Sequence, residues 1–79
     1  MDEQTERIVW DRRLIAAGRR PVYHVTTAYD GSAVDVRIRE LPLIHVFVPD
    51  ADGVPVAARN LIARLLDVQP TSFDLTTDD

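Results

Sequence analysis

Residues 34–39 alternate between aliphatic and charged side chains, and this alternation constrains the fold more than any other stretch. Val34, Val36 and Ile38 alternate with Asp35, Arg37 and Arg39. Because successive side chains of a strand point to opposite faces, a strand here has one apolar face and one charged face. A sheet built around it buries one side and leaves the other in water. The apolar side must be covered by another element of the same 79-residue chain.

Two further strands are predicted beside this one. Asp30-Gly31-Ser32 is typical of a tight hairpin turn, because Gly31 can adopt the positive φ that such a turn requires. The residues before it, 22–29, are rich in β-branched and aromatic side chains and form the first strand. Leu41-Pro42 is expected to end the second strand, since proline donates no backbone hydrogen bond. The apolar run 43–48 then forms a third strand, closed by a proline.

An amphipathic helix follows the third strand and supplies the cover. Asp52 is expected to cap it, and Pro55 is tolerated in its first turn. Its apolar residues recur at spacings of three and four: Val54, Ala57, Ala58, Leu61, Ile62, Leu65 and Leu66. Gln69-Pro70-Thr71 interrupts the pattern, and residues 72–76 are predicted to form a short last strand through Phe73 and Leu75.

The N-terminal segment is predicted to be a helix over residues 5–18. Acidic residues precede its apolar positions, arginines follow them, and Gly18 lies where a helix commonly ends. The apolar residues fall into two stripes, one of Trp10, Leu14 and Ala17 and one of Ile8 and Ile15. A strand over residues 7–11 is the alternative.

The predicted fold class is therefore α+β. It is a three-stranded antiparallel meander packed on one main helix, with an N-terminal helix and a short C-terminal strand. Residues 1–20 form an arginine-rich helix or arm, and residues 21–77 form the α+β domain. A core this small seldom supplies more than about 3–5 kcal/mol, and edge strands favour pairing with another chain. We therefore expect a homodimer, with Trp10 and Leu14 covering part of the seam.

Composition excludes several classes of function. The chain has 13 acidic and 9 basic residues, a net charge of −4, which disfavours general affinity for nucleic acid. It has no cysteine, so thiol chemistry and disulfides are excluded. No apolar run reaches the length of a membrane span and no signal peptide is found, so we expect a cytoplasmic protein that does not enter membranes. No cofactor motif is present, and no cofactor is expected.

Candidate catalytic and metal-binding residues are few. His24 and His45 could each act as a base, but both are expected to fill half-buried sheet positions and to bond locally. Asp50, Asp52 and Gly53 match part of a calcium loop, yet its remaining ligands are missing. The sequence thus predicts neither an enzyme nor a metal site.

The arginine cluster near the N-terminus is the strongest candidate for binding a partner. It consists of Arg12, Arg13, Arg19 and Arg20, with Trp10 beside them. Such a helix can contact phosphates or an acidic protein face, although cations also simply stabilise a helix C-terminus. The order helix, three strands, helix is also that of double-stranded-RNA-binding domains, but here the second helix follows Asp50 and Asp52, which repel a duplex.

Two stretches resemble the HicB-like antitoxin family. One runs from Tyr23-His24-Val25-Thr26 through Asp30-Gly31 and the valine-alternating strand to Glu40-Leu41-Pro42. The other is Ala58-Arg59-Asn60-Leu61-Ile62-Ala63-Arg64-Leu65-Leu66-Asp67-Val68, followed by Pro70, Ser72, Phe73, Asp74 and Leu75. Together they cover about residues 21–77.

The resemblance implies a partly RNase-H-like β-β-β-α-β domain without catalytic activity. It also implies self-association and, as a partner, a HicA-type ribonuclease toxin. Our leading hypothesis is thus a HicB-like antitoxin, or an orphan relative, that binds a protein through its sheet edge or its N-terminal helix. The alternative is a small nucleic-acid-binding regulator that uses the arginine cluster.

Overall fold

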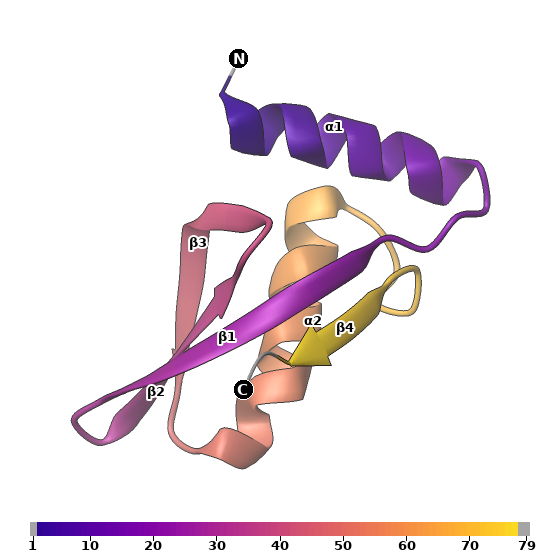
Figure 1. The fold of residues 1–79 in the computed structure, drawn as a ribbon. Helices are drawn as coiled ribbons and strands as arrows, with labels where there is room; N and C mark the ends of the chain where they lie inside the picture. Colours follow the sequence, from indigo (N-terminus) through magenta and orange to yellow (C-terminus); the bar gives the residue numbers. More distant parts are fainter. Residues whose placement is uncertain (1, 78–79) are drawn as a thin grey trace.

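A computed structural model describes residues 2–77 and shows an α+β fold, in which two helices pack with one mixed sheet (Figure 1). The elements are, in chain order, α1 (Glu3–Ala16), β1 (Val22–Asp30), β2 (Ala33–Ile38), β3 (Leu41–Val48), a short 3-10 turn (Ala51–Gly53), α2 (Val54–Leu66) and β4 (Asp74–Thr77). The predicted fold class and element order are confirmed.

The four strands form one sheet in the order β3-β2-β1-β4. β1, β2 and β3 form the predicted antiparallel meander, and β4 adds to the far side of β1 in parallel. The β1–β2 turn holds Gly31 at a φ of +66° between the paired residues Asp30 and Ala33. After β3, the chain crosses the sheet through α2, so the last strand pairs at the opposite edge from β3.

The core lies between α2 and one face of the sheet (Figure 1). Val34, Val36 and Ile38 are at most 2% exposed, as their alternation predicts. On the helix side, Ile62 and Leu66 are fully buried and belong to the same apolar cluster. Full burial of one such side chain contributes about 1.5–3 kcal/mol, so this layer supplies most of the force that holds helix and sheet together.

The third strand begins earlier than its sequence indicates. It starts at Leu41 and includes Pro42, where an end to strand pairing was expected. The register explains this difference, because Ile38 pairs with Leu41 while Arg37 pairs with His45, which leaves the intervening β3 residues in a bulge. β3 is also an edge strand, and a proline is tolerated at an edge or a bulge.

Both helices differ from prediction at their ends. α1 begins at Glu3 because Asp2 caps it, its carboxylate accepting the Thr5 N–H at 2.7 Å. Asp52 does not cap α2, whose N-cap is Gly53. Asp50 instead accepts the Gly53 N–H at the start of the preceding 3-10 turn. α2 ends at Leu66, ahead of the predicted interruption at 69–71, and β4 spans 74–77 rather than 72–76.

α1 runs across one end of the molecule, over α2 and the start of β3 (Figure 1). Its Ile8 and Ile15 stripe packs against the core, whereas Trp10 is exposed. Between the two isoleucines, Asp11 is only 1% exposed. This buried carboxylate is therefore the residue through which α1 is fixed.

Asp11 has two partners at one oxygen. The Tyr23 hydroxyl donates to Oδ2 at 2.6 Å, and Arg7 Nε donates to the same oxygen at 2.9 Å. Burial, aided by the bond to Asp11, raises the pKa of the Tyr23 phenol far above its ordinary value, so the hydroxyl keeps its proton. Gln4 adds a second tie by accepting the Leu43 N–H at 2.6 Å.

Replacing Tyr23 by phenylalanine tests how firmly α1 is attached. Tyr23→Phe removes the hydroxyl donor from a buried carboxylate, and we expect it to lower the free energy of unfolding by about 1–3 kcal/mol in urea titrations. Tyr29→Phe is the matched control, because Tyr29 is 77% exposed, and its effect should stay within about 0.5 kcal/mol. Equal effects of the two variants would contradict the role assigned to the Tyr23–Asp11 bond.

Candidate functional site

The outer face of α1, defined by Val9, Arg12, Arg13 and Ala16, turns away from the core, and Trp10 is exposed at the border of this face, one turn from Arg13. The opposite face of the helix carries the buried Asp11 and its apolar neighbours, so these five residues are left toward solvent. Trp10 is 60% exposed and Val9 is 38% exposed. Large apolar side chains exposed together on one face are typical of a binding surface.

The arginines on this face lie beside an apolar hollow. A shallow depression of about 300 Å³ is lined by Val9, Arg12, Arg13 and Ala16. Among residues 2–77, neither Arg12 nor Arg13 forms an ion pair or a side-chain hydrogen bond, in contrast to Arg7 on the inner face. Both guanidinium groups therefore keep all their donors for a ligand.

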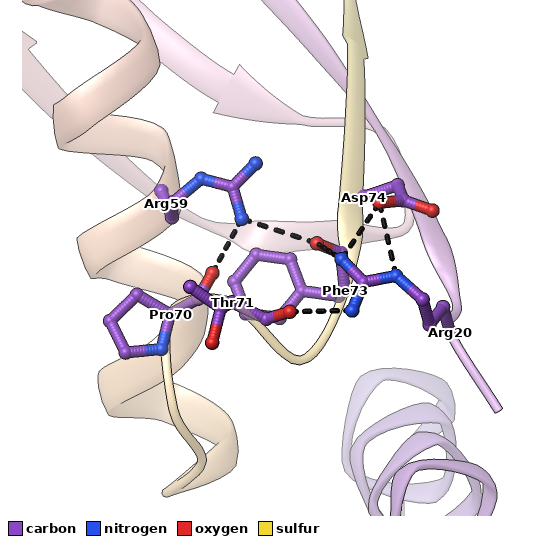
Figure 2. A network of polar contacts seen from close by, with 6 residues as sticks. All are labelled: Arg20, Arg59, Pro70, Thr71, Phe73 and Asp74. Atoms are coloured by element: carbon purple, nitrogen blue, oxygen red, sulfur yellow. Dashed lines mark hydrogen bonds and ion pairs between the residues drawn. The ribbon is translucent and has the colours of Figure 1, made fainter. Parts of the chain in front are cut away.

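Arg20 differs from Arg12 and Arg13, because its guanidinium is bonded within the fold. Its guanidinium donates to the carbonyl oxygens of Thr71 at 2.6 Å and Phe73 at 3.1 Å. It also pairs with the Asp74 carboxylate at 2.9 Å, and this hydrogen bond lowers the pKa of Asp74 (Figure 2). Arg20 thus fixes the start of β4. Arg19 is exposed and lines a separate hollow of about 210 Å³, together with Ile15, Gly18, Arg20 and Ser72.

Arg59, which the sequence pattern did not indicate, also binds the segment before β4. Arg20 and Arg59 together are called the arginine clasp. Arg59 of α2 donates to the carbonyl oxygens of Pro70 and Phe73, and its guanidinium lies 5.3 Å from the centre of the Phe73 ring (Figure 2). Arg20 and Arg59 approach the segment before β4 from opposite sides. No local pattern predicts this arrangement, because the acceptors are backbone carbonyls far away in sequence.

The face of the sheet opposite α2 carries both histidines, each bonded to a carboxylate. His24 Nδ1 lies 2.6 Å from Glu40 Oε2, and His45 Nδ1 lies 2.9 Å from Asp35 Oδ1. The expectation of local bonding is confirmed, and His24 is half-buried as expected. His45 is more exposed than expected, with 43% of its side chain accessible, because β3 is an edge strand without helical cover on this side.

The carboxylates of Asp35 and Glu40 each have a pKa below the ordinary value of the side chain. Hydrogen bonds from Arg37 and then from His45 lower the pKa of Asp35. Partial burial acts to raise the pKa of Glu40, but hydrogen bonds from the His24 N–H and ring outweigh it, and the net shift is downward. Both groups are therefore ionised at neutral pH.

The chemistry available to these sites is mainly that of binding. The hollow on α1 is open, and its side chains offer cationic donors next to apolar carbon. Over residues 2–77, no group of three or more histidines and carboxylates is placed to hold a metal ion. Neither helix in this part of the chain has the length and apolarity that crossing a bilayer requires.

Comparisons with known proteins identify no relative. Neither a protein-family model, nor a curated protein, nor a solved structure matches the chain. The function is therefore argued from the surfaces themselves.

Acid titration tests the Glu40 contact. Because the pKa of Glu40 is lower in the folded than in the unfolded chain, its contribution to stability is full above the unfolded pKa. It is lost as the pH falls through the folded value. We expect Glu40→Gln to reduce the fall in unfolding free energy between about pH 5 and 3, because the amide accepts a hydrogen bond but does not ionise.

Asp52→Asn is the control for this titration, since Asp52 is an exposed carboxylate on the 3-10 turn. Urea unfolding at several pH values should give it the acid dependence of the unaltered chain. If Glu40→Gln also kept that dependence, the assigned contribution of Glu40 would be wrong.

Proposed function

We propose that this chain is a non-catalytic, cytoplasmic protein-binding domain of the HicB-like antitoxin kind, and that the outer face of α1 docks its partner. The observation that carries the proposal is that the outer face presents Arg12 and Arg13, which have no ion-pair partner among residues 2–77, with an exposed Trp10 at its border, one turn from Arg13. Tryptophan and arginine are the residue types that most often dominate binding energy at protein interfaces.

The attachment of α1 supports this function. A helix that folds only on binding must be ordered at that moment, which weakens the complex. Here the Asp11 bonds and the packed isoleucines hold the helix before any partner arrives. Trp10 has only two side-chain torsions, so its burial in a partner costs little rotamer entropy.

The chemistry of the outer face defines the partner. It must offer an apolar cavity for Trp10 and carboxylates that meet the guanidinium groups of Arg12 and Arg13 in a bidentate manner. A HicA-type ribonuclease toxin encoded next to this chain is the partner that the resemblance implies. Binding neutralises the toxin without any reaction of the chain itself.

Charge reversal on the outer face of α1 tests this proposal. In cells that express a toxin-like product of the neighbouring reading frame, the chain should restore growth. Arg12→Glu combined with Arg13→Glu should remove the rescue and weaken binding of the purified proteins at least about tenfold, that is by 1.4 kcal/mol. Trp10→Ala should have a similar effect, because it removes the apolar anchor.

Arg64→Glu is the matched control, since Arg64 is an exposed arginine on α2. It should leave rescue and affinity unchanged, and thermal unfolding should show that every variant is folded. Full rescue by the charge-reversed double variant would refute docking through this face.

A nucleic-acid-binding regulator is the second candidate. The same unpaired arginines beside an exposed tryptophan also suit a phosphate backbone with a stacked base. Arg20 contributes less than the sequence suggests, because its guanidinium already bonds Asp74 and two carbonyls. Labelled RNA or DNA would then bind with an affinity that falls steeply with salt, and Arg12→Ala with Arg13→Ala would abolish it.

Self-association is part of the proposal, and β3 provides the edge for it. β3 is a terminal strand of the sheet, and its outward residues Leu43 and Phe47 are 68% and 49% exposed. Antiparallel pairing of two β3 strands about a twofold axis would bring these apolar residues of the two copies together.

Sedimentation equilibrium at tens of micromolar tests the dimer. We expect the unaltered chain to sediment with twice its monomer mass, and Leu43→Lys with Phe47→Lys to sediment as a monomer, because lysines on an edge strand oppose pairing. Val56→Lys is a control, since Val56 is 65% exposed on α2. A monomeric unaltered chain would disprove the dimer.

A further inference from the structure

Asp35 is nearly covered although it lies on the face of the sheet that no helix packs on. Only 10% of its side chain is accessible, because the side chains of Arg37 and His45 lie over it. Arg37 Nε donates to Oδ2 at 2.8 Å, and His45 Nδ1 bonds Oδ1 at 2.9 Å. Each carboxylate oxygen therefore has its own partner.

This arrangement fixes the guanidinium of Arg37 and the imidazole of His45 next to each other. Arg37 and His45 are direct cross-strand partners between β2 and β3, positions where side chains stand about 5 Å apart. Because Asp35 takes Nε of the arginine and Nδ1 of the imidazole, the two Nη groups and Nε2 remain for a ligand. The side chains are 58% and 43% accessible.

An aromatic surface adjoins these donors. The Phe47 ring meets the His45 ring edge to face, with 5.3 Å between centroids, and Phe47 is 49% exposed. Phe47 is the cross-strand partner of Asp35, so the ring and the carboxylate both border His45 from the neighbouring pair of the two strands. On the other side, Thr26 of β1 is the cross-strand partner of Arg37 and shares its face of the sheet.

We propose that Arg37 and His45 form a binding site for the phosphate group of a nucleotide, with the base lying against Phe47. A guanidinium with two free Nη groups binds phosphate oxygens bidentately, and the neighbouring imidazole adds a third donor when it is protonated. Stacking on an exposed ring tolerates any base, because every base has a π-face. This site lies on a different surface from the outer face of α1 and does not depend on the protein-docking function, but it shares Phe47 with the proposed β3 seam, so self-association and base stacking would compete for that ring.

The role of Asp35 in this site is to orient. Its negative charge is balanced by the Arg37 guanidinium, so the site does not attract anions through net charge alone. Selectivity comes instead from the direction of the donors, which Asp35 fixes through one bond to each group. Arg39 and His24 lie further along the same face, and His24 is bonded to Glu40 rather than to Asp35.

NMR titration of the full chain tests the site. Uridine monophosphate is added at constant ionic strength, and the side-chain signals of Arg37, His45 and Phe47 are followed. We expect saturable shifts at these three residues and weaker binding of inorganic phosphate, which lacks the base. Uridine, which lacks the phosphate, should bind at least about tenfold more weakly than the monophosphate, because the arginine contact is lost.

Two substitutions locate the binding energy. Arg37→Lys keeps the charge but loses bidentate geometry, and it should weaken binding of uridine monophosphate about tenfold. His45→Gln should also weaken it. Arg64→Lys on α2 is the matched control and should leave the affinity unchanged. Thermal unfolding of each variant shows whether the fold is retained.

Four results would overturn the assignment. The first is shifts that grow without saturation as nucleotide is added. The second is equal affinity for uridine and its monophosphate, and the third is equal affinity for inorganic phosphate and the nucleotide. An Arg37→Lys chain that binds like the unaltered one would exclude Arg37 as the phosphate ligand. Unchanged protein docking in the Arg37→Lys variant separates this test from that of the α1 face.

Discussion

The contact between α2 and the aliphatic face of β2 is the constraint on which the rest of the structure depends. One helix covers one face of a four-stranded sheet, and Val36 and Ile62, which are fully buried, lie in the middle of that layer. Because α1 lies across one end of the molecule, no helix of residues 2–77 covers the second face of the sheet, and that face stays open. Polar side chains on this open face hydrogen-bond to one another. His24 bonds the Glu40 carboxylate, and His45 bonds the Asp35 carboxylate.

Charged clasps attach the peripheral elements to this two-layer core. α1 is held through the buried Asp11, and β4 is held through Arg20 and Arg59. At the buried Asp11, a lost partner leaves an unsatisfied polar group at a cost of about 1–3 kcal/mol. The contacts of Arg20 with Thr71 and Asp74 are exposed to solvent, and they fix the direction of the chain at the start of β4.

The sequence predicts the elements whose signal is local. Alternation in β2, the Asp30-Gly31 turn and the three- and four-residue spacing in α2 all depend on near neighbours, and all three are found. One prediction that fails is local, since Gly53 rather than Asp52 is the N-cap of α2, but other failures involve distant residues. Pro42 stays within β3 because a bulge accommodates it, and the apolar spacing in α1 cannot tell which of its two stripes meets the core. The stripe with Ile8 does, so Trp10 is left exposed.

The candidate sites show the same division between local and distant signals. Arg12, Arg13 and Arg20 form one cluster in sequence, yet their guanidinium groups have different roles because Asp74, which neutralises Arg20, lies more than fifty residues away. The pairing of His45 with Asp35 depends equally on strand register, which a periodic pattern does not specify. Positions of charges along a chain thus predict a binding surface only after the internal partners are known.

Net charge is for this reason a poor guide to what the surfaces bind. Asp11, Asp35 and Asp74 each pair with an arginine in the fold and cancel in the total of −4, so this total does not say where the unpaired arginines lie. At physiological ionic strength, charges more than about 8 Å apart on the surface are largely screened from one another. A ligand at the outer face of α1 therefore meets two unpaired guanidinium groups rather than an acidic protein. On the open face of the sheet, Asp35 balances the charge of Arg37. Recognition of a phosphate in the proposed site there depends on the orientation of the Arg37 and His45 donors rather than on excess positive charge.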